Sequence, residues 1–394
     1  MPDVALPFSR AEYAQRLAKV RTAMAAAGLD LLWISDPSNM AWLTGYDGWS
    51  FYVHQGVLVG QEVDPIWWGR SQDANGAVRT VYMPEADIVG YPDRLVQNPT
   101  DHPMGHLADL IRARGWGTAR LGAEWDNYYF SAKALDVLRA GLPDAVLSDA
   151  TGLVNWCRAV KSDAEIGYMR QAARIVEKAM ARAIELIEPG RRKNDLVAEV
   201  YRTQIAGTDE FGGDYPAIAP LLPTGSDAAA PHLTWDDKPF QPGAGTFFEL
   251  AGCVRRYHCP LCRTVYLGTP PQFLVEAEKA LVEGLNDGLE VARPGNRAGD
   301  VAAALYAALG RAGIEREGRC GYPIGLSYPP DWGERTISFR TTDDTILQAG
   351  MTFHFMPGLW MADWGLEITE SILIREAGPA ECLASVERKL FVKP

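Results

Sequence analysis

A repeat in the second part of the chain constrains its fold more than any other feature of the sequence. Glu185–Gly190 ends in Pro-Gly and is followed by Asp195–Tyr201, and the same pattern recurs 105 residues later (from 185 to 290) in Glu290–Gly295 and Asp300–Tyr306. Pro-Gly ends a helix, and the Asp lies where a second helix would begin. Pro-Gly is a common helix stop, so chance is one explanation, but the matching Asp and Tyr favour duplication.

A strand-rich stretch follows each copy of the repeat, over roughly 211–268 and 320–376. Each half therefore consists of a helix pair and a sheet. Two such halves predict a pseudo-symmetric α+β domain with a pocket between them.

The first part of the chain has the alternating pattern of an α/β domain. Ser9–Ala27 is predicted to form a helix, Leu29–Ser35 a short buried strand, and Asp36–Asn39 a turn. Strands and helices continue to alternate up to about residue 150. This pattern indicates a small sheet covered by helices.

The domain boundary is expected directly after Arg158, which divides the chain into 1–158 and 159–394. Ser162 or Asp163 can cap the long helix that begins the second domain.

Composition excludes several classes of partner. The 394 residues carry a net charge of −12, so neither nucleic acid nor an anionic membrane surface is an expected partner. No run of residues approaches the length of a membrane span, and the N-terminus lacks the basic and apolar regions of a secretory signal. Six cysteines are too few for a disulfide scaffold, which favours the cytoplasm.

Several motifs carry a resemblance to a known family. Glu249–Thr264 has the outline of a metallopeptidase strand, and Arg158–Ile166, Pro231 with His232, and Gly350–Trp360 match other characteristic segments. The chain thereby resembles the pita-bread family of methionine aminopeptidases, Xaa-Pro peptidases and creatinase, over nearly its whole length. The resemblance implies an α/β creatinase/prolidase-like N-terminal domain, followed by an α+β pita-bread catalytic domain with an internal pseudo-two-fold repeat.

The positions that hold two divalent ions in that family carry other side chains here. By resemblance, the five positions fall on Glu249, Pro260, Tyr322, Met356 and Thr369, with Glu370 replacing Thr369 if the register slips by one. Proline has no side-chain donor, and two hard cations need several oxygen or nitrogen donors each. The resemblance therefore implies a metal-independent enzyme without a cofactor.

Within the family, four long strings resemble the ectoine hydrolases: residues 36–55, 230–237, 257–261 and 321–334. This resemblance implies a hydrolase acting on C–N bonds, which opens the cyclic amidine of ectoine to N-acetyl-L-2,4-diaminobutyrate. Hydroxyectoine is a further candidate substrate. The resemblance also implies a homodimer that works ahead of a separate deacetylase.

Three alternatives stay open. They are a creatinase-type guanidine hydrolase, an Xaa-Pro peptidase with an unusual metal set, and a protein that binds a zwitterion without turnover.

Ectoine is a small zwitterion whose ring carbon is already activated by the positive charge of the amidinium. Glu249 is the predicted nucleophile, because a carboxylate can bind the amidinium by charge-assisted hydrogen bonds and attack that carbon. Glu370 is a second catalytic candidate. His232 is the predicted general acid/base, because its unperturbed pKa lies near neutrality.

Aromatic rings can stack on a planar amidinium, and core packing is an equal explanation for each ring alone. The family's dimers imply that Trp49 and Tyr52 reach the pocket of the partner subunit. Arg335 is a candidate partner for the substrate carboxylate. The predicted substrate-binding residues are Glu367, Trp49, Tyr52, Tyr322, Tyr328, Trp332, Trp360 and Trp364.

Glu249 and the two cysteines of the CxxC motif can also be explained by structural roles. Glu249 could pair with Arg255 or Arg256 instead of meeting substrate. Cys259 and Cys262 form a single CxxC inside a predicted strand, which is weak evidence for zinc or redox chemistry, so both are expected to be structural.

Overall fold

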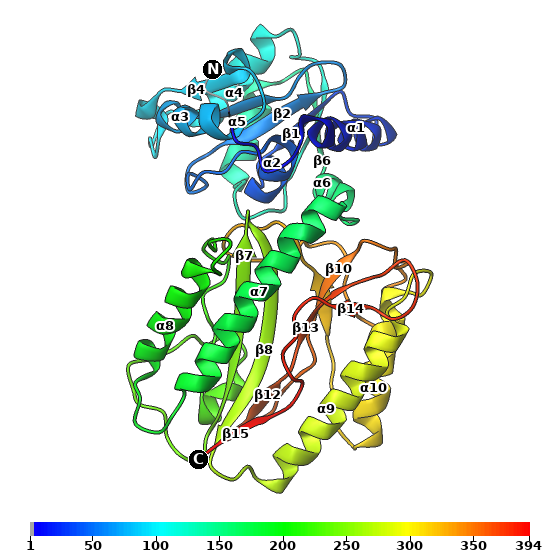
Figure 1. Ribbon diagram of the computed structural model, residues 1–394. Coiled ribbons are helices and arrows are strands. Elements are labelled where there is room, and N and C mark those ends of the chain that lie inside the picture. Colours follow the sequence, from blue (N-terminus) through cyan, green and yellow to red (C-terminus); the bar gives the residue numbers. More distant parts are fainter. Residues whose placement is uncertain (1–3) are drawn as a thin grey trace. The chain divides into compact units, whose positions relative to one another are not determined.

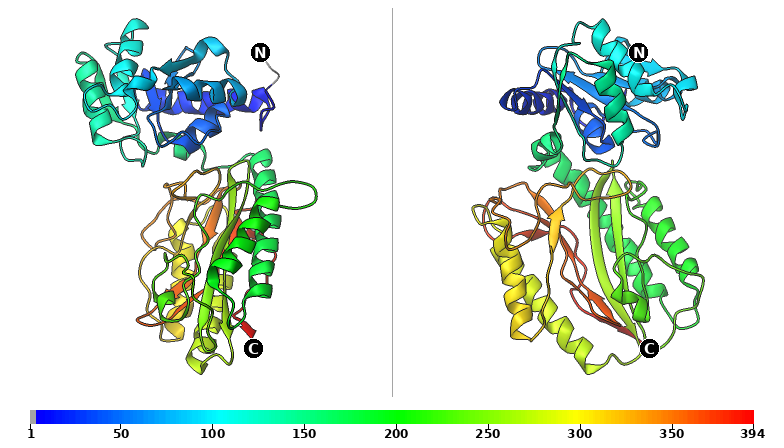
Figure 2. Two further views of the ribbon diagram at one scale, coloured as in Figure 1. Left: turned by 90° about the vertical axis from the view of Figure 1, so that its left-hand side faces the viewer. Right: turned by 180° about the vertical axis from the view of Figure 1, so that it is seen from behind.

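The computed structural model describes residues 4–394. The chain folds into two compact units, Met1–Arg158 and Ala159–Pro394, which Figures 1 and 2 show from three sides. Over the described part of the chain, no helix is long and apolar enough to cross a membrane.

The first unit is built on a mixed six-stranded sheet with the order β4-β3-β2-β1-β5-β6. Its strands are β1 (Leu31–Ile34), β2 (Gly56–Gly60), β3 (Ile66–Arg70), β4 (Ile88–Tyr91), β5 (Arg120–Ala123) and β6 (Val146–Asp149). Its helices are α1 (Arg10–Ala26), α2 (Pro37–Thr44), α3 (Ser71–Thr80), η1 (Glu85–Asp87), η2 (Asp93–Leu95), α4 (Pro103–Ala113), α5 (Ala132–Gly141) and α6 (Leu153–Cys157).

Most of the local predictions for this unit are confirmed. The predicted helix at Ser9–Ala27 is α1, with Ser9 as its N-cap. The predicted turn at Asp36–Asn39 is wrong, because the Asp36 side chain accepts a hydrogen bond from the Ser38 N–H and starts α2. Pro37 fits the first turn of that helix, where its missing N–H costs nothing.

The second unit contains the two helix pairs that the repeat predicts. Its helices are α7 (Asp163–Leu186), α8 (Lys193–Ala206), η3 (Gly225–Ala229), α9 (Gln272–Val291) and α10 (Ala298–Arg311). Its strands are β7 (Gly245–Val254), β8 (Tyr257–Leu267), β9 (Gly321–Pro323), β10 (Thr352–Phe355), β11 (Gly358–Trp360), β12 (Gly365–Glu367), β13 (Glu370–Leu373), β14 (Glu381–Cys382) and β15 (Phe391–Lys393).

The long antiparallel hairpin of β7 and β8 lies beside α7 and α8, and α9 and α10 lie on the side of β10, β12 and β13 (Figure 1). β9, β10, β13 and β14 form a four-stranded sheet in the order β14-β13-β10-β9. Both halves thus present strands toward the middle of the unit and helices toward its outside.

α7 begins at a capping box, in which Ser162 and Glu165 satisfy each other's backbone N–H groups. The helix packs closely on β7: a Cβ atom placed on Gly252 would lie 1.9 Å from the Ala172 carbonyl oxygen. Glycine is therefore required at this crossing, because any side chain would push helix and strand apart.

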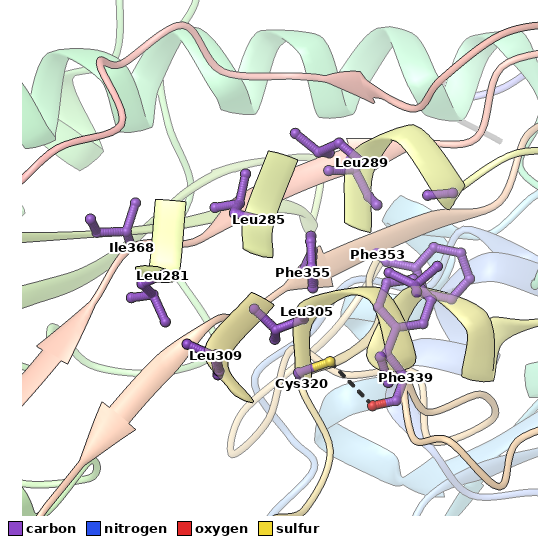
Figure 3. Close-up of a cluster of buried hydrophobic side chains, with 14 of the residues drawn as sticks. Leu281, Leu285, Leu289, Leu305, Leu309, Cys320, Phe339, Phe353, Phe355 and Ile368 are labelled. Atoms are coloured by element: carbon purple, nitrogen blue, oxygen red, sulfur yellow. Dashed lines mark hydrogen bonds between the residues drawn. The ribbon is translucent and has the colours of Figure 1, made fainter. Parts of the chain in front are cut away.

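A separate apolar core joins the second helix pair to its strands. Leu281 and Leu285 of α9, Leu305 of α10, and Phe353 and Phe355 of β10 are fully buried in it (Figure 3). This packing holds β9 and β10 against the helices, and both strands contribute side chains to the site described next.

Candidate active site

Glu249 lies in the middle of β7, opposite Cys262 of β8, so both side chains lie on the same face of the hairpin. It is only 6% exposed. Burial, and then the charge of Asp331, raises the pKa of Glu249 from 4.5 to about 7. Arg256 donates to the carbonyls of Tyr215 and Ser327 instead, so it is not the structural partner of Glu249.

Glu367, the last residue of β12, is a second buried carboxylate. Among the described residues no group donates a well-formed hydrogen bond to either of its oxygens, and the Cys262 thiol is a weak polar neighbour. Burial, and then the charge of Glu249, raises the pKa of Glu367 well above its usual 4.5. The two carboxyls therefore resist being ionised together.

A chain of hydrogen bonds runs from Trp332 to Thr369 beside these carboxylates. The Trp332 indole N–H donates to the Tyr322 hydroxyl (2.9 Å), and that hydroxyl lies 3.0 Å from His354 Nδ1. His354 Nε2 lies 2.7 Å from Thr369 Oγ1, which also accepts the Cys262 N–H. Both ring nitrogens of His354 thus meet a hydroxyl.

His354 is the histidine that the fold brings to Glu249. The closest approach, from Nδ1 to Oε1, is 3.9 Å, which is too long for a hydrogen bond. Burial, and then the charge of Arg319, lowers the pKa of His354 to about 3, so the ring is neutral at physiological pH. The sequence assigned His354 no catalytic role, although it lies two residues before Met356, one of the family's metal-binding positions.

His232 is placed differently. It is exposed, in the irregular segment between η3 and β7, and no hydrogen bond or ion pair within residues 4–394 involves it. Within the described residues, no hydrogen bond or ion pair therefore joins His232 to Glu249.

Glu370 and Thr369 have opposite surroundings although they are neighbours in sequence. Glu370 forms a buried ion pair with Arg263 of β8 (2.6 Å). The same guanidinium donates to the carbonyls of Cys262 and Thr369. Glu370 is thus held by an internal cation, whereas Thr369 faces His354.

The predicted aromatic residues of the second unit divide into two groups. Tyr322 and Trp332 belong to the hydrogen-bonded chain, and Trp360 of β11 packs against Cys262 and Phe247. A Cβ atom on Gly358 would lie 2.7 Å from the Trp360 ring and 3.3 Å from Glu367 Cγ, which places ring and carboxylate together.

Tyr328 and Trp364 lie against other groups. Tyr328 is buried under the guanidinium of Arg256, which is 4.9 Å from its ring centroid. Trp364 packs on Phe273 of α9, at 5.3 Å between centroids.

Trp49 and Tyr52 belong to the first unit and are the most exposed of the predicted aromatic residues, at 58% and 64%. Trp49 packs on Phe51, and the Tyr52 hydroxyl accepts a hydrogen bond from Arg70. Their exposure leaves both rings accessible to another molecule.

The donor set does not fit the pair of divalent ions that the family's metal-dependent members hold. In the described part of the chain, no group of three or more His, Cys, Asp or Glu side chains is arranged to hold a metal ion. Tyr322 is hydrogen-bonded to Trp332, its pKa is raised far above 10 by burial, and Pro260 offers only a carbonyl, which accepts from Ser371. These donors are too few and too weak for two hard cations.

Known proteins match both units. The model of metallopeptidase family M24 matches residues 167–376, and that of the creatinase/prolidase N-terminal domain matches residues 16–160. The ectoine hydrolase of Halomonas elongata is 62% identical over 400 residues, with 100% of both chains covered. An uncharacterized hydrolase/peptidase of Sinorhizobium fredii is 40% identical over 98% of this chain and 99% of its own.

Solved structures share the fold. Dipeptidase PepE from Mycobacterium ulcerans superposes with a TM-score of 0.81 at 23% identity, covering 98% of this chain and 99% of its own. A prolidase from Thermococcus sibiricus gives 0.83 at 18% identity, covering 97% and 99%. The predicted fold class and family are confirmed: the chain is a hydrolase of metallopeptidase family M24, in which a creatinase/prolidase N-terminal domain precedes the M24 domain.

Proposed function

We propose that this hydrolase opens the cyclic amidine ring of ectoine without a metal ion. The observation that carries the proposal is the buried pair of Glu249 and Glu367, in a site whose donors do not suit two divalent ions. A desolvated carboxylate without an ion-pair partner binds a small organic cation strongly. Full-length identity of 62% to the ectoine hydrolase of Halomonas elongata supports ectoine as that cation.

Glu249 is the nucleophile in this proposal. Its ionised carboxylate binds the amidinium and attacks the ring carbon between the two nitrogens, forming a C–O bond to the substrate. One ring C–N bond then breaks, and the departing nitrogen takes a proton. Water adds its oxygen to the same carbon and releases Glu249 unchanged, which leaves the N-acetyl group of N-acetyl-L-2,4-diaminobutyrate.

Glu367 is the substrate-binding carboxyl in this proposal. Its raised pKa keeps it protonated beside the ionised Glu249, so its O–H can donate while Glu249 attacks.

Tyr322 and His354 are the residues that transfer protons in this proposal. The hydroxyl of Tyr322 is close enough to Glu249 for the carboxylate charge to raise its pKa further, after burial. Because both nitrogens of His354 meet hydroxyls, the neutral ring can pass a proton between Tyr322 and Thr369 by exchanging tautomers. His232 stays a candidate only if substrate brings its exposed segment to the site.

Several finer predictions rest on the sequence or the resemblance alone and remain proposals. They are the homodimer, the cytoplasmic location, the use of hydroxyectoine, the action of Trp49 and Tyr52 in the partner subunit's pocket, and a separate deacetylase that consumes the product.

The direct test is to incubate the chelator-treated, full-length protein with ectoine and to follow the ring-opened product by NMR. Product formation at an undiminished rate after chelation is expected, and no product from folded protein would refute the proposal. Tyr322→Phe should lower kcat by on the order of 10²-fold, whereas His232→Ala should leave kcat nearly unchanged.

The same assay separates the alternatives. Turnover of creatine would favour a guanidine hydrolase, and cleavage of Xaa-Pro dipeptides restored by Mn²⁺ would favour a peptidase. Tight ectoine binding without turnover would indicate a binding protein.

A further inference from the structure

Two arginines reach the candidate active site from the segment between α10 and β9. The Arg319 guanidinium lies 4.6 Å from the ring centroid of Tyr322. The Arg316 guanidinium lies 5.4 Å from the ring centroid of Trp360. Neither residue belongs to a segment that matches a motif, and only the fold brings this segment to the two rings.

Neither arginine has an ion-pair partner among the described residues. Arg311, a few residues earlier, forms ion pairs with Glu283 and Asp287. Across residues 4–394, no carboxylate forms an ion pair with Arg316 or Arg319. Arg319 is exposed, so its guanidinium is free to bind a ligand from solution.

Arg316 fixes the position of Arg319. Its Nη2 donates to the Arg319 carbonyl (3.3 Å), and its Nη1 is buried without a hydrogen-bond partner. The stem of Arg316 is therefore held between the Trp360 ring and the backbone of the turn that carries Arg319.

The site thus contains charges of both signs. Asp331 lies beside Tyr322, since a Cβ atom on Gly333 would be 3.3 Å from both its carboxylate oxygens and Tyr322 Cδ2. Arg319 faces the same Tyr322 ring. An isolated cation would gain from Glu249 and lose from the arginines, whereas a zwitterion of matching length gains from both.

We propose that Arg319 binds the ring carboxylate of the substrate and that Arg316 is a positioning residue that holds the turn on which Arg319 lies. This inference rests on the proposed function and extends it to substrate selection. A guanidinium over Tyr322 offers two parallel N–H donors to a carboxylate while the amidinium lies toward Glu249. The substrate class is therefore a cyclic amidine with a carboxylate on the ring.

The experiment compares ectoine with the same cyclic amidine lacking the carboxylate, for wild-type protein and Arg319→Gln. The wild type should prefer ectoine in kcat/KM, and Arg319→Gln should lose on the order of 10²-fold on ectoine, mainly through KM. The variant should change little on the decarboxylated amidine. Equal losses on both substrates, or no loss on ectoine, would overturn the assignment.

Further variants test whether the effect is specific to the Arg319 guanidinium. Arg319→Lys keeps the charge and should retain part of the preference. Arg316→Ala should raise KM for ectoine by a larger factor than KM for the decarboxylated amidine. Arg311→Gln removes a matched surface arginine and should change nothing. Loss of the preference with Arg335→Gln rather than Arg319→Gln would move the carboxylate site to Arg335 and refute the proposal.

Failure of the proposed function can be distinguished from failure of the role of Arg319 alone. If wild-type protein does not turn over ectoine, the proposed function and this inference fall together. If the wild type turns it over and Arg319→Gln keeps the full preference, the function stands and only the role of Arg319 is lost.

Discussion

Three glutamates on three different strands, β7, β12 and β13, have three different environments. Glu370 is paired with Arg263, Glu367 has no internal hydrogen-bond donor of good geometry, and Glu249 retains slight exposure. Environments that push the pKa values of neighbouring carboxyls apart are typical of sites that assign them different roles. Glu249 is the carboxylate most available to a cationic substrate.

Glu249→Gln should abolish turnover and stabilise the fold at alkaline pH. Folded Glu249 keeps its proton up to about pH 7, whereas in the unfolded chain it ionises near 4.5, so the stability associated with that proton is lost as pH rises through this window. The variant should therefore gain about 3 kcal/mol in unfolding free energy at pH 8 and much less at pH 4.5. Urea unfolding at both pH values measures this.

The exposed Glu290→Gln serves as the control for that measurement, because Glu290 pairs with Arg293 on the surface. It should shift stability little at either pH. An equal effect of Glu249→Gln at both pH values would contradict the raised pKa.

Glu370→Gln should weaken the fold and leave the chemistry intact. Removing one partner of a buried ion pair leaves Arg263 uncompensated, which costs roughly 3–5 kcal/mol. Denaturant unfolding should show this loss, and kcat per folded molecule should stay near the wild-type value. Lost turnover at undiminished stability would instead make Glu370 catalytic.

At the scale of elements, the site depends on how closely α7 approaches β7. The crossing has no room for a side chain at Gly252, since the nearest atoms are backbone atoms of α7 and cannot rotate away. The hairpin of β7 and β8 carries both Glu249 and Cys262, so a shift at this crossing would displace these two residues.

Gly252→Ala should destabilise the protein by roughly 1–3 kcal/mol or more, because helix and strand must separate. Gly310→Ala is the matched control, since Gly310 lies in α10 and a Cβ there meets nothing within 4 Å. That control should be neutral or stabilising by up to about 1 kcal/mol. Thermal unfolding of both variants would decide, and equal behaviour would argue against the close crossing.

At the scale of the whole molecule, each unit has an apolar core of its own. Leu107 is fully buried in the core that joins α4 and α5 to the first sheet, and Leu305 in the core under α9 and α10. Separate cores permit separate unfolding.

Calorimetry should accordingly resolve two transitions. Leu107→Ala should lower the midpoint of one and Leu305→Ala that of the other, each by the equivalent of about 2–5 kcal/mol. A single transition that both variants shift equally would show that the units unfold as one.

The sequence by itself determined the family and most of the elements. The Pro-Gly repeats predict where α7 and α9 end, because helix stops are local chemistry, and long motif strings identify an M24 chain. The sequence alone also shows that the family's metal-binding positions carry other side chains here, since this depends only on residue type.

The tertiary structure decided which groups meet. Thr369 and Glu370 are neighbours at the start of β13, but only the fold shows that Thr369 contacts His354 and that Glu370 pairs with Arg263, 107 positions earlier. The same holds for Arg319 over Tyr322 and for the exposed place of His232. Contacts between strands and loops far apart in sequence depend on sheet register and packing, and no local pattern encodes them.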